Sequence, residues 1–319
     1  MSESAKSSTA DDVRALSSDR AERGRLGTIA SWSIFPLIMF GSLVLAIAWM
    51  PSQGVYAAVF EAQIVALLAI AAAERLLPYR PAWNRLHGDL GVDALHAIVS
   101  GLGTTQIARP FVQLLGAAFA AELAHVFGAT LWPVGWPLLL QLALALVIAE
   151  LPQYWLHRWQ HEHDILWRFH SVHHSAPRLY WLNAARFHPI DLGVLYVVGY
   201  LPLVLLGCPV DVILLFGLFD AVFGMLQHCN ADVRLGPLNR IFSMAEPHRW
   251  HHSRTLAEAN TNYGSNLIVW DLVFGTFYLP SDREPPAAIG IADLPHFPST
   301  YLGQIAAPFR WRRIRERPN

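Results

Sequence analysis

Long apolar runs are the feature of this sequence that most constrains its fold. Residues 29–50 contain no charged side chain, and the run is long enough to cross a bilayer as a helix, which takes about 20 residues. A second run, 54–73, follows after the short uncharged segment 51–53. Charged residues make up only 15% of the chain, against about 25% in soluble domains. The sequence therefore predicts an integral membrane protein.

Later apolar runs extend this pattern. Residues 91–127 are too long for one straight helix, and we predict a single crossing that is broken at Arg109 and Pro110. Residues 136–154 return the chain, and 190–206 with 210–227 are expected to form a hairpin that enters and leaves on one side. The predicted fold class is all-α and polytopic, with about four to six transmembrane helices.

These runs divide the chain into four predicted parts. Residues 1–28 are polar and rich in Ser and Ala, which is typical of a disordered tail. Residues 29–150 form transmembrane helices, and residues 151–280 hold most of the histidines together with the hairpin 190–227. Residues 281–319 form a tail that is rich in proline and then basic.

Arginines predict the orientation. Four of them, Arg14, Arg20, Arg23 and Arg25, precede the first run, so the positive-inside rule places the N-terminus and the connector 74–89 in the cytoplasm. The order of crossings then brings the histidines to the cytoplasmic face, where the arginines of residues 310–317 suit anionic lipid. Lys6 is the only lysine among 23 basic residues. This bias indicates a GC-rich bacterial genome and hence a bacterial inner membrane.

Charge and cysteine content exclude several classes of function. The net charge of -1 offers no surface for a polyanion, so we expect no nucleic-acid partner. Cys208 and Cys229 have no CxxC partner and cannot make a disulfide framework. Cysteine chemistry is not expected to carry the function.

Histidines are concentrated in one part of the chain. Eleven of the fifteen lie between positions 157 and 252. Eight of them occur as one HxxxH pair and two HxxHH clusters, which place imidazoles on one face of a helix: His157, His161, His170, His173, His174, His248, His251 and His252. Pro247 suits the first helical position before the last cluster.

Metal binding is the simplest explanation of this spacing. Clustered imidazoles repel one another when protonated, whereas neutral imidazole binds iron, zinc, copper or nickel. One ion needs three or four protein ligands, so eight to ten histidines imply two ions. His188 and His228 are single candidates, and His163 lies off the ligand face and should be exposed. Four others have no partner at ligand spacing: His87, His96, His125 and His296.

The histidine pattern resembles the fatty acid hydroxylase and sterol desaturase superfamily of membrane di-iron oxygenases. The resemblance covers residues 151–278 and rests on HRWQH, HSVHHS, RFHP, the pair His228 and Asn230, PHRWHH, the turn Asn262-Tyr263-Gly264, and Trp270-Asp271 followed by Phe274-Gly275-Thr276. It implies ten metal ligands, namely the eight clustered histidines with His188 and His228. It also implies supporting roles for Asn262, Tyr263, Trp270 and Asp271, with Asp271 the best candidate to accept the N–H of a ligand imidazole.

The resemblance further implies the chemistry. Two iron ions would support O2-dependent hydroxylation or desaturation of a lipid that enters from the bilayer, with zinc able to replace iron on purification. No segment resembles a heme-binding cytochrome b5, so electrons are expected from a separate protein. Asp191 stands where many relatives carry glutamate, which leaves its role open.

Two other functions use the same histidines. A zinc-dependent membrane hydrolase or metal-handling protein would bind zinc, although the HExxH spacing of a common protease site is absent. A heme-binding electron carrier would place single histidines inside apolar runs, whereas here they gather at the polar ends. The identity of the lipid, the choice between hydroxylation and desaturation, and the oligomeric state stay open.

Overall fold

The structure is all-helical in the part of the chain that it describes. The computed structural model describes residues 24–128 and 130–316, where the only β-pairing consists of isolated bridges. Five helical stretches are long and apolar enough to cross a membrane: Gly24–Gln53, Val55–Leu76, Leu90–Phe127, Leu138–Glu162 and Val210–His228. The predicted all-α, multi-pass fold is therefore confirmed, and all but the last five residues of the predicted tail lie outside the described residues.

The first two spans form an antiparallel pair. The first is built from α2 (Gly24–Phe35), the π-helical turn η1 (Pro36–Phe40) and α3 (Gly41–Gln53), and it begins five residues before the predicted run. The chain reverses at Gly54, whose positive φ of 80° suits glycine, and α4 (Val55–Leu76) packs along α3. Together with α7 and α10, this pair contributes to the main hydrophobic core.

The third span is one continuous helix. It consists of α5 (Leu90–Leu95), the π-helical stretch η3 (His96–Gly103) and α6 (Thr104–Phe127). The predicted break at Arg109 and Pro110 is wrong, because Pro110 lies inside α6. A transmembrane helix tolerates proline where neighbouring groups satisfy the freed backbone. The irregular turn lies earlier instead, at η3.

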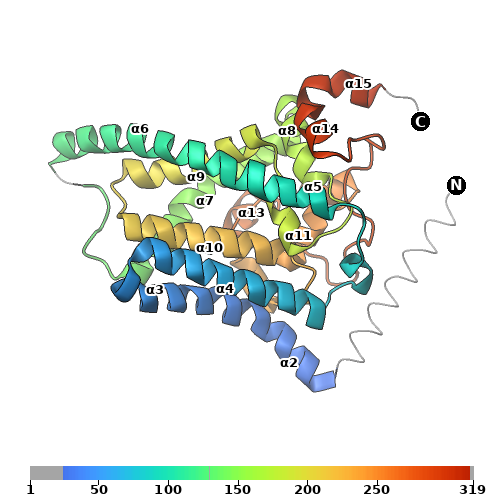
Figure 1. Cartoon of the computed structure of the whole chain (residues 1–319), viewed down its shortest axis with the longest axis horizontal. Helices are drawn as coiled ribbons and strands as arrows, with labels where there is room; N and C mark the ends of the chain where they lie inside the picture. Colours follow the sequence, from blue (N-terminus) through green and yellow to red (C-terminus); the bar gives the residue numbers. More distant parts are fainter. Residues whose placement is uncertain (1–23, 129, 317–319) are drawn as a thin grey trace, which may run out of the picture.

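Three helices complete the membrane part. The helix α7 (Leu138–Glu162) packs against both α9 (Pro189–Leu205) and α10 (Val210–His228), and α9 also packs along α6. A short connection, residues 206–209, joins α9 to α10, and the two helices run in opposite directions, as the sequence suggested (Figure 1). Figure 1 shows the packed pairs α6 with α9, α10 with α4, and α4 with α3 running across the molecule.

The shorter elements gather at one end of these helices (Figure 1). They include α8 (Asp164–His174), η4 (Trp181–Ala185), α11 (Ala245–His251), α12 (Leu256–Ala259), α13 (Val269–Phe274), α14 (Tyr301–Ala306), η6 (Ala307–Arg310) and α15 (Trp311–Arg315). The remaining short turns are η2 (Pro81–Asn84) and η5 (Gly236–Arg240). The histidine-rich segments therefore meet where α7 and α10 end.

Candidate metal centre

The structure brings nine of the ten predicted histidine ligands into two compact groups. The first group contains His157, His161, His170, His174 and His251. The second contains His173, His228, His248 and His252. Within each group the candidate ligand nitrogens all lie within 4.8 Å of one another. Two adjacent metal positions fit this arrangement, one with five imidazoles and one with four.

The helices divide their histidines between the two groups. On α8, His170 and His174 are one turn apart and enter the first group, whereas His173 enters the second. The last cluster divides in the opposite sense, because His251 of α11 enters the first group and His248 and His252 enter the second. The helix α11 begins at Ala245, so Pro247 is its third residue, still within the first turn where no backbone N–H is needed. Both short helices thus lie between the two metal positions.

The orientation of the imidazoles fits a cation in the first group. His157 Nδ1 lies 2.7 Å from the carbonyl oxygen of Tyr263, and His170 Nδ1 lies 3.0 Å from Asp191 Oδ2, so both Nδ1 atoms carry the proton. Their Nε2 atoms then face each other with lone pairs, 3.1 Å apart. Two lone pairs at this distance repel unless a cation lies between them. Ligand nitrogens on metal bonds of about 2.1 Å are separated by about 2.9–3.4 Å, which matches.

The second group shows the same convergence. His248 Nε2 lies 2.9 Å from His228 Nε2 and 3.0 Å from His252 Nε2. Buried imidazole nitrogens without a hydrogen-bond partner occur in both groups: His161 Nε2, His174 Nε2 and His251 Nε2 in the first, and His173 Nδ1, His248 Nδ1 and His252 Nδ1 in the second. Unpartnered buried nitrogens are costly, and binding a metal removes that cost for the three Nε2 atoms of the first group. The residues present therefore fit metal ions.

One loop orients three ligands of the first group. His157 donates to the backbone oxygen of Tyr263, and His251 donates to that of Thr261 at 2.8 Å. His161 Nδ1 lies 3.2 Å from Asn260 Oδ1. These bonds fix which ring nitrogen faces the metal, which is the usual task of groups around a metal site. The family resemblance had pointed to Tyr263, but the sequence analysis had missed Asn260 and Thr261.

A buried carboxylate orients a fourth ligand, and it is not the one we expected. Asp191, near the start of α9, accepts from His170 Nδ1 and from Gln160 Nε2. Asp271 instead accepts from the backbone N–H groups of Tyr263 and Gly264, both at 2.8 Å. The expectation that Asp271 accepts a ligand N–H is therefore corrected. It acts one step away by fixing the loop whose carbonyl receives His157.

The other two predicted supporting residues lie in the same region. Asn262 has a positive φ of 55° and ties its loop to α11 by donating to the carbonyl oxygen of Pro247 at 2.9 Å. Trp270 stacks on Phe274 and has no hydrogen bond to a histidine. Burial raises the pKa of Asp271 to about 6, because its carboxylate is removed from water.

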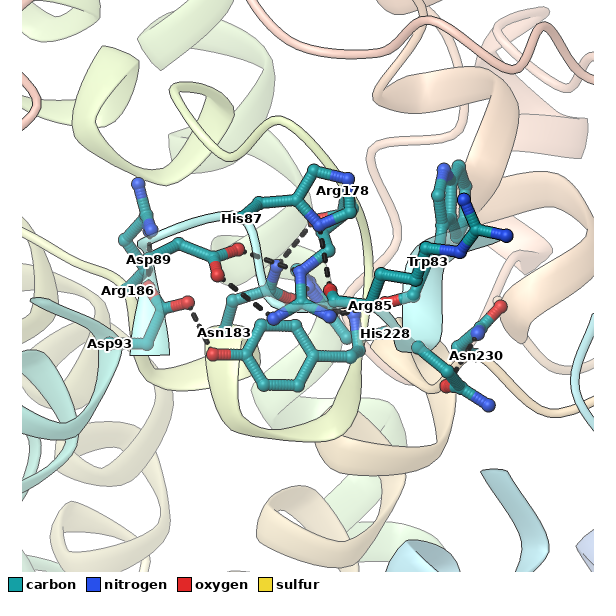
Figure 2. Close-up of polar contacts among 12 residues, drawn as sticks. Trp83, Arg85, His87, Asp89, Asp93, Arg178, Asn183, Arg186, His228 and Asn230 are labelled. Carbon is teal, nitrogen blue, oxygen red and sulfur yellow. Dashed lines mark hydrogen bonds and ion pairs between the residues drawn. The ribbon is translucent and has the colours of Figure 1, made fainter. Parts of the chain in front are cut away.

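A buried polar network supports the second group. His228 Nδ1 lies 3.2 Å from Asn183 Oδ1, and Asn183 donates from Nδ2 to the carbonyl oxygen of Arg178. Arg178 makes two hydrogen bonds to Asp89, of 2.7 and 2.9 Å (Figure 2). A second buried ion pair, Arg186 with Asp93, lies beside it. Asn183 is a further residue that sequence spacing had missed, since a lone Asn carries no recognisable signal.

Burial keeps the imidazoles outside the spans in the neutral form. Loss of water, followed by the charge of neighbouring imidazoles, lowers the pKa of six histidines well below the usual value of about 6.5: His170, His173, His174, His248, His251 and His252. Neutral imidazole is the form that binds metal. The electrostatics therefore agree with the geometry.

His188 is the one predicted ligand that the structure does not bring to either group. Its Nδ1 accepts from the backbone N–H of Ile190 and caps α9, and its Nε2 donates to the carbonyl oxygen of Ile305. Both ring nitrogens are thus used within the protein, which leaves none for a metal. His188 instead fastens the C-terminal segment, as does His96, whose Nε2 lies 2.7 Å from Gln304 Oε1.

The remaining histidines lie apart from the groups. His163 is exposed, as predicted, and so are His87, His125 and His296. The C-terminal arginines that are described line a surface cavity of about 980 Å³ together with Asp164 and Arg168 of α8. Arg315 pairs with Asp164 there.

Comparison with known proteins identifies the family. Residues 142–276 match the fatty acid hydroxylase family model. The chain is 44% identical over 246 residues to the ornithine lipid hydroxylase OlsE of Rhizobium tropici. These residues are 75% of this chain and 72% of that protein. The chain belongs to the fatty acid hydroxylase family. The predicted resemblance is therefore confirmed, and with it an enzyme of a membrane lipid hydroxylase family.

Two further relatives match shorter regions. The alkylglycerol monooxygenase of Danio rerio is 36% identical over 177 residues, which are 54% of this chain and 38% of that protein. Methylsterol monooxygenase 1 of Rattus norvegicus is 30% identical over 132 residues, which are 41% of this chain and 44% of that protein. No solved structure matches the chain significantly.

Proposed function

We propose that this protein is a di-iron, O2-dependent hydroxylase of a membrane lipid. The observation that carries the proposal is the pair of buried imidazole groups at one end of the membrane helices, with lone pairs facing each other at about 3 Å. Iron bound there supplies the power to oxidise an unactivated C–H bond, which no side chain can do. The three relatives are named as hydroxylases or monooxygenases, which favours hydroxylation over desaturation.

The chain's own residues hold and orient the reacting partners. Asp191, Asn183 and the loop 260–264 fix the tautomers of five imidazoles, those of His157, His161, His170, His228 and His251, so that the other ring nitrogen of each is free to bind a metal. The apolar helices exclude water and align the lipid with the centre. In the overall reaction, one oxygen atom of O2 enters the C–H bond, and the other leaves as water with two protons and two electrons. A separate donor protein supplies those electrons.

The orientation and the lipid complete the proposal. The positive-inside pattern supports a site that faces the cytoplasm of a bacterial inner membrane, where a soluble electron donor has access. Ornithine lipid is the first substrate to test, because the relative with 44% identity is named for it. The division into a transmembrane part, 29–150, and a catalytic part, 151–280, is part of the same proposal.

Metal analysis and turnover test the proposal together. Protein purified without a metal-affinity step should contain about two irons per chain, and His248→Ala should contain about one, because His248 belongs only to the second group. Wild-type protein with O2, a reductase system and ornithine lipid should yield lipid that is heavier by one oxygen atom, and His248→Ala should not. Stoichiometric zinc with turnover independent of O2 would instead support the hydrolase alternative.

A further inference from the structure

An arginine without a carboxylate partner lies inside the membrane part. Arg109 is near the centre of the span Leu90–Phe127, and no ion pair in residues 24–128 and 130–316 includes it. Thr104 lies beside Gly193 of α9, and Gly116 lies beside Val204. Arg109, between Thr104 and Gly116, is therefore level with the middle of α9. A charged side chain at this depth is costly and usually marks a functional contact.

Two stacked tyrosines connect Arg109 to α10. Arg109 lies close to Tyr196, whose ring stacks on Tyr200 at a centroid distance of 4.2 Å. Tyr200 then reaches across to α10, where its ring contacts Phe216 edge-on at 5.1 Å. Its hydroxyl lies over Gly217, 3.0 Å from the position that a Cβ would take there. Hydrogen-bond donors thus form a line across α6 and α9 to the face of α10.

The face of α10 continues from Gly217 to the second histidine group. Gly224 and His228 follow at intervals of seven and four residues, so all three lie on one side of the helix. A Cβ built on Gly224 meets no atom within 4 Å, which leaves open space one turn from His228. On α9, Tyr196 and Tyr200 lie about 8 and 14 Å along the helix from Asp191, at a rise of about 1.5 Å per residue.

We infer that this face binds the acyl part of the lipid substrate. Arg109, Tyr196 and Tyr200 donate hydrogen bonds to an acyl oxygen, either the carbonyl of an ester or amide or the carboxylate of a fatty acid. The rest of the molecule extends past Gly224, where no atom lies within 4 Å of an added Cβ, and reaches the metal groups. The substrate class is therefore an acylated lipid whose chain extends from this oxygen along α10 toward the second histidine group. The statement that the bound lipid is the substrate rests on the proposed function. The statement that a lipid binds here rests on the geometry alone.

Photolabelling tests the binding without any turnover. The protein in nanodiscs of diether phosphatidylcholine, which carries no acyl oxygen, is exposed to a diazirine-bearing palmitate or to its methyl ester, and labelling of α9 and α10 peptides is titrated. Tyr200→Phe should weaken labelling by both probes about 2- to 10-fold, as expected for one neutral hydrogen bond. If the ligand group is a carboxylate, Arg109→Gln should weaken labelling by palmitate about 10- to 150-fold. If it is a carbonyl, Arg109→Gln should weaken labelling by the ester about 2- to 10-fold. Tyr56→Phe, at an exposed tyrosine of α4, is the control.

A pair of glycine substitutions tests the open space beside His228. Gly224→Ala and Gly41→Ala each add one methyl group where no atom lies within 4 Å, and alanine favours the helix, so both variants should fold. Labelling of α10 should fall several-fold in Gly224→Ala only, with the metal content of both variants unchanged. Equal labelling of Gly224→Ala and Gly41→Ala would overturn the inference. Equal labelling of Tyr200→Phe and wild type would overturn it as well. Absence of iron or turnover would defeat the proposed function and leave this result standing.

Discussion

Replacing Asp191 by Asn should selectively weaken the five-histidine group. In the native protein the two carboxylate oxygens each accept one bond, from His170 and from Gln160. An Asn side chain has the same shape but offers one acceptor, so one of the two donors must face an NH2 group. The negative charge that strengthens the His170 bond is also lost.

Two estimates of the magnitude agree. Loss of a hydrogen bond to a charged group costs about 1.5–3 kcal/mol. Substitutions of groups that orient metal ligands lower metal affinity by about 10- to 100-fold, which corresponds to about 1.4–2.7 kcal/mol. We therefore expect the first group of Asp191→Asn to lose its metal at a chelator concentration about 10- to 100-fold lower than in wild type.

The assay measures metal per chain during chelator titration. Asp191→Asn should release one equivalent early and the second at the wild-type concentration, because Asp191 bonds to no histidine of the second group. Asp211→Asn, at an exposed position near the start of α10, is the matched control. Release of both equivalents together, or an unchanged titration, would refute the assignment of Asp191 to His170.

Three further substitutions probe other contacts. His188→Ala should keep its full metal content and lose about 1 kcal/mol of stability through the missing cap of α9, whereas metal loss would restore it as a ligand. Gly264→Ala would place a Cβ 2.3 Å from the carbonyl oxygen of Leu267, so the loop that orients three imidazoles must shift, and metal content should fall while Gly41→Ala retains it. A cysteine at the exposed Arg254 should react with an impermeant thiol reagent only from the cytoplasmic side, and labelling from outside would reverse the proposed orientation.

Much of the fold could be predicted because membrane helices are encoded locally. A run of about 20 apolar residues must satisfy its own backbone, and the helix is the simplest way to do so. Proline was the exception. At Pro110 the local rule predicted a break, but the helix continues through it, and the irregular turn is found at His96–Gly103 instead.

Much of the candidate site was also visible in the sequence. Helical spacing alone predicted that the histidines of HxxxH and HxxHH share faces, and they do converge. Spacing could not reveal the oxygen atoms that orient them. The carbonyl of Thr261 carries no sequence signal at all, and the sequence favoured Asp271 as the acceptor, whereas the fold places Asp191 beside an imidazole and Asp271 beside backbone N–H groups.

The sequence by itself determined an all-helical membrane protein of the fatty acid hydroxylase type with clustered imidazoles. Only the tertiary structure decided how those imidazoles divide. His173 is separated from His174, and His251 from His252, because each short helix lies between two groups and presents neighbouring residues in different directions. It also decided that His188 caps a helix, since a single histidine has no periodicity and its role depends on which chain segment packs against it.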